Sequence, residues 1–369
     1  MKNVQRFSKA AAPNTILAAA LFAIFTAAAP AILAAERESQ NLTGDGTQPL
    51  VLRQVGSFFI GGRDIAIPYG EGKLINPTYE PTDVIKIDQM YVQFMFPMER
   101  KHEFPVIFVH GAFHTGKTWE VTPDGREGWA EYFTRRGFDT YWVDKPWKGR
   151  SAFNLQLING VERGDAPPST LPSPVILGHN GWSVFRFGPS YGVPNPGVQF
   201  PLEAVDEWLK QLVPDFSFYL RGTPSTVSYP ALNTDVEALL KKTGPAVYVG
   251  HSQGGGEIIT IVEAISNPNL FAGLISVEGG RCPPVADAPL YKNVPFLYVT
   301  GDFTTPPASC EPFIAALNAL GGSGTSLHLP DLGIMGNDHM MMMDRNNLEV
   351  ANVIQDWIDE HVERKPRGE

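Results

Sequence analysis

The chain has little cysteine and little charge. It holds 2 Cys among 369 residues, and its Asp, Glu, Lys and Arg together make up 18%, against 43% hydrophobic residues. That balance excludes a disordered acidic tail and a basic nucleic-acid binder. No histidine stands at ligand spacing from either cysteine, so the sequence predicts no metal site. The 36 Gly and 32 Pro stay below the level of a low-complexity sequence. We expect a full hydrophobic core with many turns.

Basic residues are scarce after the first 35 positions. The whole chain has 29 Lys and Arg and 39 Asp and Glu, and the only charges in residues 1–35 are Lys2, Arg6 and Lys9. Removing that segment leaves 26 basic and 39 acidic residues, a net charge of −13. An excess of negative charge repels phosphate backbones, so the sequence predicts no nucleic-acid partner.

Long apolar runs are confined to the N-terminus. Residues 1–35 start with basic residues, continue with the uncharged run ILAAALFAIFTAAAPAILAA and end in small residues. This layout is typical of a secretory signal peptide, with an uncleaved membrane anchor as the alternative. Pro30 and the Ala-rich end favour cleavage. We therefore expect a periplasmic or secreted protein, without stable membrane insertion once the signal is removed.

The two cysteines can pair in an oxidising compartment. Cys282 and Cys310 are 28 residues apart, and each stands in a loop rich in Gly and Pro. The sequence predicts a structural disulfide between them, with two buried thiols as the alternative.

Short apolar strands alternate with amphipathic segments along residues 36–369. This is the pattern of a single α/β domain with a mostly parallel sheet, which opens on an antiparallel pair and closes on a helix at 346–365. The expected strands are residues 57–67, 83–96, 104–111, 138–144, 246–252, 270–279, 294–302 and 325–332.

Residues 151–232 interrupt this alternation of apolar strands and amphipathic segments. A structureless loop of that length is improbable in a folded domain, so we expect a cap or lid insertion. Its aromatic residues either pack a small core within the insertion or line an apolar binding pocket. They are Trp182, Phe185, Phe187, Tyr191, Phe200, Phe216, Phe218 and Tyr219.

The motif that carries chemistry is Gly250-His251-Ser252-Gln253-Gly254, a match to G-x-S-x-G. An apolar strand precedes it and a helix follows. A turn this tight strains the serine backbone and lifts its hydroxyl above the sheet edge, and the flanking residues must be small. The backbone N–H of Gln253 begins the helix, where it can stabilise an oxyanion. We predict Ser252 as a nucleophile, with a simple surface turn as the alternative.

A serine nucleophile needs a base and a carboxylate. Where the serine stands on a tight turn between a strand and a helix, the carboxylate and then the histidine follow it in the chain. Of the three later histidines, His328 lies in a strand and His361 on a charged helix. His339 lies in the loop between the last strand and the last helix, where the base belongs. Glu278 and Asp302 each end a strand. We prefer Glu278 as the acid because two glycines follow it, and Asp302 is the alternative.

A competing motif precedes these residues. GAFHTGKT, residues 111–118, matches the nucleotide-binding pattern G-x-x-x-x-G-K-[ST]. That function requires a helix to begin at the Lys-Thr pair, and the Pro and Gly of residues 123–125 break any helix almost at once. We interpret the stretch instead as the loop after His110-Gly111 that supplies a second oxyanion donor, the N–H of Ala112.

Together these residues resemble the α/β-hydrolase superfamily over residues 55–363. The strings VHGAFHTGKTWE, VGHSQGG and GIMGNDHMMMMDRNN, with Asp144 and the following Gly149-Arg150-Ser151, look like a branch of secreted bacterial esterases. The resemblance implies an α/β-hydrolase fold, a mostly parallel sheet flanked by helices, with the cap between the fourth strand and the nucleophile strand. It also implies a glutamate as the triad acid, which favours Glu278. Some relatives carry adjacent cysteines where this chain has Ala112-Phe113.

The sequence therefore predicts an exported serine hydrolase that cleaves carboxylic esters through an acyl-enzyme intermediate and needs no metal or organic cofactor. We expect a small-molecule ester with apolar or aromatic groups as substrate. Hydrolysis of lactones, amides or polyesters on the same triad is the alternative, and a non-catalytic binding protein on the same fold is a more remote one. The sequence does not set the oligomeric state.

Overall fold

The computed structural model describes residues 49–68, 82–153, 155–170, 176–215 and 229–362. The chain divides into two compact units, Met1–Asn41 and Leu42–Glu369, and every described residue belongs to the second. The predicted signal segment, residues 1–35, lies outside the described residues. Within the described ranges, no helix has both the length and the apolar character that a membrane span requires.

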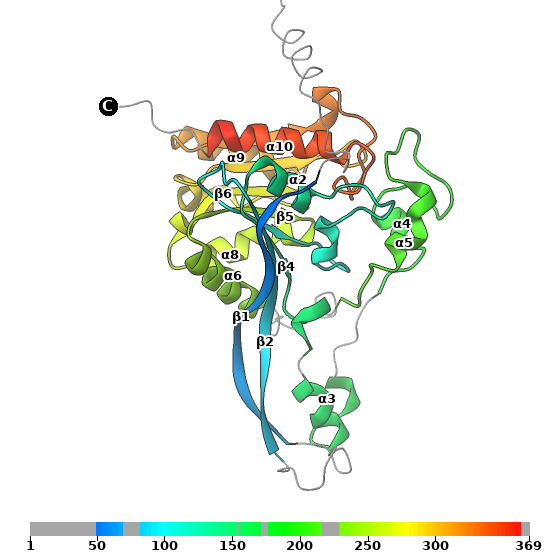
Figure 1. Ribbon diagram of the computed structural model, residues 1–369, viewed down its shortest axis with the longest axis vertical. Helices are drawn as coiled ribbons and strands as arrows, with labels where there is room; N and C mark the ends of the chain where they lie inside the picture. The colour runs from blue at the N-terminus through cyan, green and yellow to red at the C-terminus, as the bar shows by residue number, and fades with distance from the viewer. Residues whose placement is uncertain (1–48, 69–81, 154, 171–175, 216–228, 363–369) are drawn as a thin grey trace, which may run out of the picture. The chain divides into compact units, whose positions relative to one another are not determined.

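An eight-stranded sheet forms the centre of this unit, in the order β1-β2-β4-β3-β5-β6-β7-β8 (Figure 1). β2 pairs antiparallel with both β1 and β4, and every other neighbouring pair is parallel. The predicted mostly parallel sheet with an antiparallel opening pair is confirmed. The strands are β1 Leu52–Pro68, β2 Thr82–Pro97, β3 Val106–Val109, β4 Thr140–Asp144, β5 Ala246–His251, β6 Phe271–Val277, β7 Phe296–Thr300 and β8 Gly324–His328.

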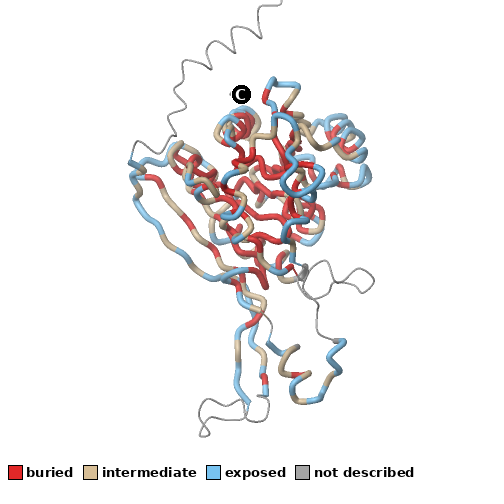
Figure 2. The backbone as a smooth tube through the Cα atoms, turned by 90° about the vertical axis from the view of Figure 1, so that its right-hand side faces the viewer, coloured by how far each residue is buried: buried red, intermediate tan, exposed pale blue. Residues whose placement is uncertain are grey.

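The central strand β3 explains why the sheet needs helices on both faces. All four of its residues are buried, and successive side chains of a strand point to opposite faces. Val106 and Phe108 pack in the apolar cluster that includes α2 and α10, and Ile107 packs in the cluster with α6, α8 and α9. Figure 2 shows the buried strands running through the middle of the unit. Because this strand is buried on both faces, its residues form the continuous apolar run seen in the sequence.

The helices are short apart from α6 and α10. The α-helices are α2 Trp129–Arg136, α3 Leu155–Glu162, α4 Gly181–Val184, α5 Val205–Leu209, α6 Tyr229–Thr243, α7 Gln253–Gly256, α8 Ile258–Ala264, α9 Cys310–Ala319 and α10 Asn347–His361. The 3-10 turns are η1 Gly116–Trp119, η2 Gly149–Ser151, η3 Pro168–Thr170, η4 Leu202–Ala204, η6 Pro268–Leu270, η7 Val285–Tyr291 and η8 Leu329–Leu332.

Residues 151–232, the predicted insertion, run from the end of η2 into the first residues of α6, and this segment is called the insertion below. Four of its predicted aromatics, Trp182, Phe185, Phe187 and Phe200, are buried, together with Trp208 of α5. The rings of Phe187 and Phe200 stack with centroids 4.0 Å apart. These aromatics pack in the same apolar cluster as Val106 and Phe108 of β3 and the residues of α10. Tyr191 is exposed, and residues 216, 218 and 219 lie outside the described part of the chain.

Candidate active site

Ser252 stands on the sharp turn between β5 and α7. Its φ of +51° lies in the left-handed region, which is strained for a residue with a side chain. A Cβ on Gly250 would lie 2.4 Å from the carbonyl oxygen of Gly254, and one on Gly254 would lie 2.6 Å from that of Val109. The backbone is therefore packed too closely for any residue but glycine on either side of the serine. The Ser252 amide donates to Val277 O at 2.8 Å, which ties the turn to β6.

The predicted base and acid lie in line behind the serine hydroxyl. Ser252 Oγ is 2.8 Å from His339 Nε2, and His339 Nδ1 is 2.7 Å from Glu278 Oε2. His339 and Glu278 are buried, whereas Ser252 is half-buried. The geometry orients the imidazole with Nδ1–H donating to the carboxylate, so that Nε2 can accept the serine proton.

Glu278 follows β6 with a φ of +51° and accepts from several donors. The Gly301 amide donates to Oε1 at 3.0 Å, and Thr304 Oγ1 donates to Oε2 at 3.0 Å. Burial alone would raise the pKa of this carboxyl, but the hydrogen bond and charge of His339, with the charge of Arg186, hold its pKa below the usual value. Glu278 is therefore ionised, as an orienting carboxylate must be.

The pKa of His339 is lowered, chiefly because the ring is buried. Glu278 opposes that effect, and the positive charge of Arg186 adds to it. The neighbouring His251 ring lies 4.8 Å away, and its Nε2–H donates to His339 O at 2.7 Å. Burial holds the pKa of His251 well below its usual value. Both imidazoles are therefore neutral near pH 7, which leaves His339 free to take up a proton.

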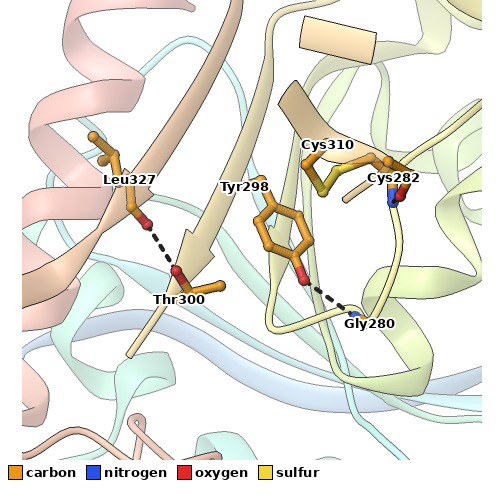
Figure 3. The surroundings of a disulfide bond; sticks show 7 residues. Gly280, Cys282, Tyr298, Thr300, Cys310 and Leu327 are labelled. Carbon is orange, nitrogen blue, oxygen red and sulfur yellow. Dashed lines mark hydrogen bonds between the residues drawn. A yellow bond between two sulfur atoms is a disulfide. The ribbon is translucent and has the colours of Figure 1, made fainter. Parts of the chain in front are cut away.

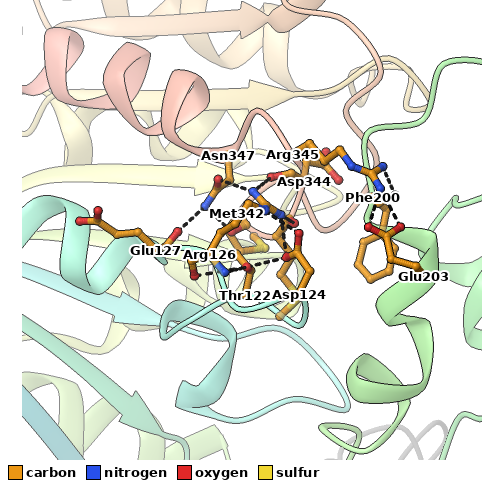
Figure 4. A network of polar contacts seen from close by, with 11 residues as sticks. Thr122, Asp124, Arg126, Glu127, Phe200, Glu203, Met342, Asp344, Arg345 and Asn347 are labelled. Atoms are coloured by element: carbon orange, nitrogen blue, oxygen red, sulfur yellow. Dashed lines mark hydrogen bonds and ion pairs between the residues drawn. The ribbon is translucent and has the colours of Figure 1, made fainter. Parts of the chain in front are cut away.

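The His339 loop is clamped by a polar network (Figure 4). Arg126 donates to the carbonyl oxygens of Met343 and Asp344 at 2.8 Å each, and pairs with Asp124 at 2.6 Å. Asp344 Oδ2 in turn accepts from the side-chain amide of Asn337 at 2.9 Å. The loop therefore reaches the serine from a fixed position, although it has no regular secondary structure.

The other predicted candidates have different partners. Asp302, the alternative acid, accepts from the Gly336 amide. His328 lies 3.7 Å from Asp331, and His361 Nδ1 lies 3.1 Å from Ser323 Oγ. The structure brings none of these three into the Ser252–His339–Glu278 line.

The predicted oxyanion loop lies against the serine. A Cβ on Gly111 would be 2.9 Å from Ser252 Cβ, so this position requires glycine for close approach. Ala112 lies three residues after β3, next to Gly111, and Gln253 is the first residue of α7. The two residues predicted to donate backbone N–H groups therefore stand next to Gly111 and next to Ser252 in the chain.

The competing nucleotide-binding motif does not lead into a long helix. Its Lys-Thr pair falls in the four-residue turn η1, as the following Pro and Gly predict. Lys117 Nζ donates to the carbonyl oxygen of Val121 at 2.5 Å, two residues after the end of η1.

Comparisons with known proteins agree with this arrangement. A solved structure of a novel bacterial esterase is 40% identical to the chain, covers 86% of it and 98% of the esterase, and superposes with a TM-score of 0.77. The chain belongs to the α/β-hydrolase superfamily. A fungal protein (strain ATCC 74256) named "Probable secreted lipase phiG" is 27% identical over 328 residues, which cover 73% of this chain and 85% of the fungal protein. No family model matches the sequence.

In this α/β-hydrolase the predicted cysteine pair is present as a disulfide. Cys282 and Cys310 are bonded, and both are buried (Figure 3). Cys282 lies four residues after Glu278, and the Gly280 amide between them donates to the Tyr298 hydroxyl at 3.2 Å. The bond fixes the loop after the acid to the start of α9.

Sequence reasoning missed the charged residues that surround the hydrolase site. Arg186, from the insertion, lies against both the Glu278 carboxylate and Nδ1 of His339. Lys145, directly after β4, donates to Gln253 Oε1 at 2.6 Å and pairs with Glu257 at 3.0 Å. One signal was available for the lysine, because the carboxyl ends of parallel strands meet at one edge of a sheet. Nothing in the sequence marks the arginine.

Proposed function

We propose that the chain is an exported serine hydrolase that cleaves carboxylic esters. The observation that carries this proposal is the continuous line of short contacts from Ser252 Oγ through the His339 ring to the Glu278 carboxylate. The esterase that shares 40% of its residues supports an ester as the substrate class.

In the proposed reaction Ser252 Oγ attacks the ester carbonyl while His339 Nε2 takes its proton. Glu278 stabilises the imidazolium that forms, and the N–H groups of Ala112 and Gln253 bind the oxyanion. His339 then gives the proton to the leaving alkoxide, which leaves an acyl-serine. Water, activated by the same imidazole, attacks the acyl-serine and releases the acid.

The substrate class is proposed from the aromatic side chains beside the base. The Phe185 ring lies 5.6 Å from the His339 ring and 5.2 Å from that of Trp208. These buried rings give the base apolar surroundings, which suit an ester with an apolar or aromatic acyl or alcohol group. A series of p-nitrophenyl esters of increasing acyl length tests this, and kcat/KM independent of length would contradict it.

Export is proposed from residues 1–35 and from the disulfide, which an oxidising compartment favours. The name of the fungal relative, a secreted lipase, agrees with it. Fusion of residues 1–35 to the N-terminus of a reporter that is active only in the periplasm tests this step. A reporter that stays inactive in the cytoplasm would contradict it.

Substitution Ser252→Ala tests the mechanism. Because the members of such a triad act as a unit, we expect hydrolysis of p-nitrophenyl butyrate to fall to near the background rate. A fluorophosphonate should label the wild-type serine and not the variant. Turnover by Ser252→Ala at the wild-type rate would overturn the proposed function.

A further inference from the structure

The loop at Ala112-Phe113 has a backbone that needs support. Phe113 has a φ of +63°, in the left-handed region that disfavours a residue with a side chain. An oxyanion donor is useful only within a few tenths of an ångström of its position in the transition state. A strained loop that carries such a donor must therefore be held from outside.

The support comes from the end of the insertion. The Phe113 amide donates to Asp215 Oδ2 at 2.9 Å, and the Val213 amide donates to Phe113 O at 2.7 Å. A second link runs through His114, whose Nδ1 donates to Ala112 O at 2.8 Å and whose Nε2 accepts from Trp208 Nε1 at 3.1 Å. Three residues of the segment 208–215 thus hold the loop directly after Ala112, at Phe113 and His114.

Asp215 can serve as an anchor because it has a buried cation beside it. Its side chain is fully buried, and Lys148 Nζ, itself only 5% exposed, lies 2.6 Å from Oδ2. Burial lowers the pKa of Lys148 to about 8, and the charge and hydrogen bond of Asp215 oppose that shift. The carboxylate and the ammonium therefore depend on each other for their charge.

We propose that Asp215, paired with Lys148, is a positioning residue that holds the N–H of Ala112 at the oxyanion, so that the insertion completes the active site from the oxyanion side. This inference rests on the proposed function of the Ser252 site. Asp215 acts through the Phe113 amide and touches no reacting atom. Its contribution therefore appears in the transition state rather than in substrate binding.

Two double variants isolate the hydrogen bond from the charge. Asp215→Leu with Lys148→Met removes the acceptor and its cation together, so that no buried charge is left unpaired. Asp215→Asn with Lys148→Met differs from it only in offering an acceptor to the Phe113 amide. We expect the leucine variant to lose roughly 10- to 100-fold in kcat on p-nitrophenyl butyrate at unchanged KM. The asparagine variant should stay within roughly fivefold of the wild type.

The matched control is Glu203→Gln. Glu203 also ties the insertion to the body, through Arg345 at 2.6 Å (Figure 4), but both side chains of this pair are exposed. We expect its kcat to equal that of the wild type. Equal kcat values for the two double variants, or a loss of kcat in the control as large as in the leucine variant, would overturn the proposal.

Binding of two ketones separates this inference from the proposed function. An alkyl trifluoromethyl ketone adds to Ser252 and forms an oxyanion, whereas the methyl ketone of the same chain binds without adding. The leucine variant should weaken only the trifluoromethyl ketone, by the factor lost in kcat. Equal weakening of both would mean general damage and overturn the inference. A wild type that binds the trifluoromethyl ketone but hydrolyses no ester would contradict the proposed function alone. If the leucine variant does not fold, Asp215→Ala with Lys148→Met takes its place, because it also removes the acceptor of the Phe113 amide and the buried cation. Wild-type kcat and ketone affinity in that variant would overturn the inference.

Discussion

The two ends of the site are held in different ways. At the acid–base end, His339 and Glu278 present side chains from segments that follow strands of the sheet, and each has its own hydrogen-bond partners there. At the oxyanion end, Ala112 presents only a backbone N–H, and its neighbour Phe113 is anchored by Asp215, 102 residues away in the chain. The first end takes its side chains from the core of the fold, with Phe185 and Arg186 of the insertion packed beside them, whereas the second is anchored by the insertion.

This difference teaches where sequence can reveal a site. Side-chain chemistry restricts residue type, so an acid–base end leaves a pattern of Ser, acid and His. A backbone donor restricts only conformation, and the residue that holds it can come from any segment that packs there. The following predictions test each end separately, from the largest expected effect to the smallest.

Substitution Glu278→Gln should have the largest effect on the acid–base end. The glutamine amide can donate to Nδ1 and so favour the wrong imidazole tautomer, and we expect kcat/KM on p-nitrophenyl butyrate to fall roughly 10⁴-fold. Trifluoromethyl ketone binding would show whether the oxyanion end survives in this variant.

Asp302→Asn is the matched control for that prediction, because Asp302 also ends a strand of the sheet but bonds to the Gly336 amide. We expect its kcat/KM to stay within about tenfold of the wild type, since only one backbone contact is weakened. A greater loss in Asp302→Asn than in Glu278→Gln would reassign the acid.

Removal of the disulfide should change stability far more than catalysis. The bond between Cys282 and Cys310 spans 28 residues, and the loop-entropy model gives about 3–4 kcal/mol of unfolding free energy for a loop of that length. Glu278 keeps its contacts with Gly301 and Thr304 in the Cys282→Ala, Cys310→Ala double variant. We therefore expect kcat at 25 °C to fall less than about threefold.

Urea unfolding and ester turnover, measured on the same preparation of this double variant, separate the two effects. Ser309→Ala is the control, because it removes a single hydrogen bond to the Cys282 amide and leaves the disulfide intact. A folded double variant with kcat reduced a hundredfold would show that the acid–base end also needs support from beyond the sheet.

Much of the fold and of the acid–base end could be predicted from the sequence. Buried parallel strands give continuous apolar runs, and the close packing at Gly250 and Gly254 gives the G-x-S-x-G pattern its meaning. The sequence left Glu278 and Asp302 as alternatives because both follow neighbouring strands, whereas the structure places Glu278 against His339 and Asp302 against the Gly336 amide.

The charged supports could not be predicted. Arg186 and Asp215 stand in irregular segments without periodicity, and their partners are 92 and 102 residues away in the chain. Which residues of an insertion meet the core is decided by its aromatic packing, here around Trp208, and that packing has no repeat in the sequence. Lys148 follows a strand closely, but its distance from β4 does not show that it points toward the insertion.

The smallest effect on activity is expected from substitution of Arg186, the residue through which the insertion contacts the acid–base end. The guanidinium of Arg186 is 31% exposed and adds to the burial that lowers the pKa of His339. Because Nδ1 already donates its proton to Glu278, the arginine acts on the ring through charge. His339 must be neutral to act as a base, so activity is lost as pH falls through its pKa. Arg186→Gln should raise that pKa and move the acid limb of kcat/KM to higher pH.

Above that limb the rate should change by less than about fivefold, since a partly exposed ion pair contributes about 1 kcal/mol or less. The other groups that face the ring, Glu278, His251 and His114, are unchanged in this variant, so the direction of the shift belongs to the arginine. Arg186→Lys should keep the limb near its wild-type position. If Arg186→Gln instead lowers kcat at every pH without moving the limb, the arginine is a structural anchor like Asp215, and both ends of the site depend on the insertion for position rather than for charge.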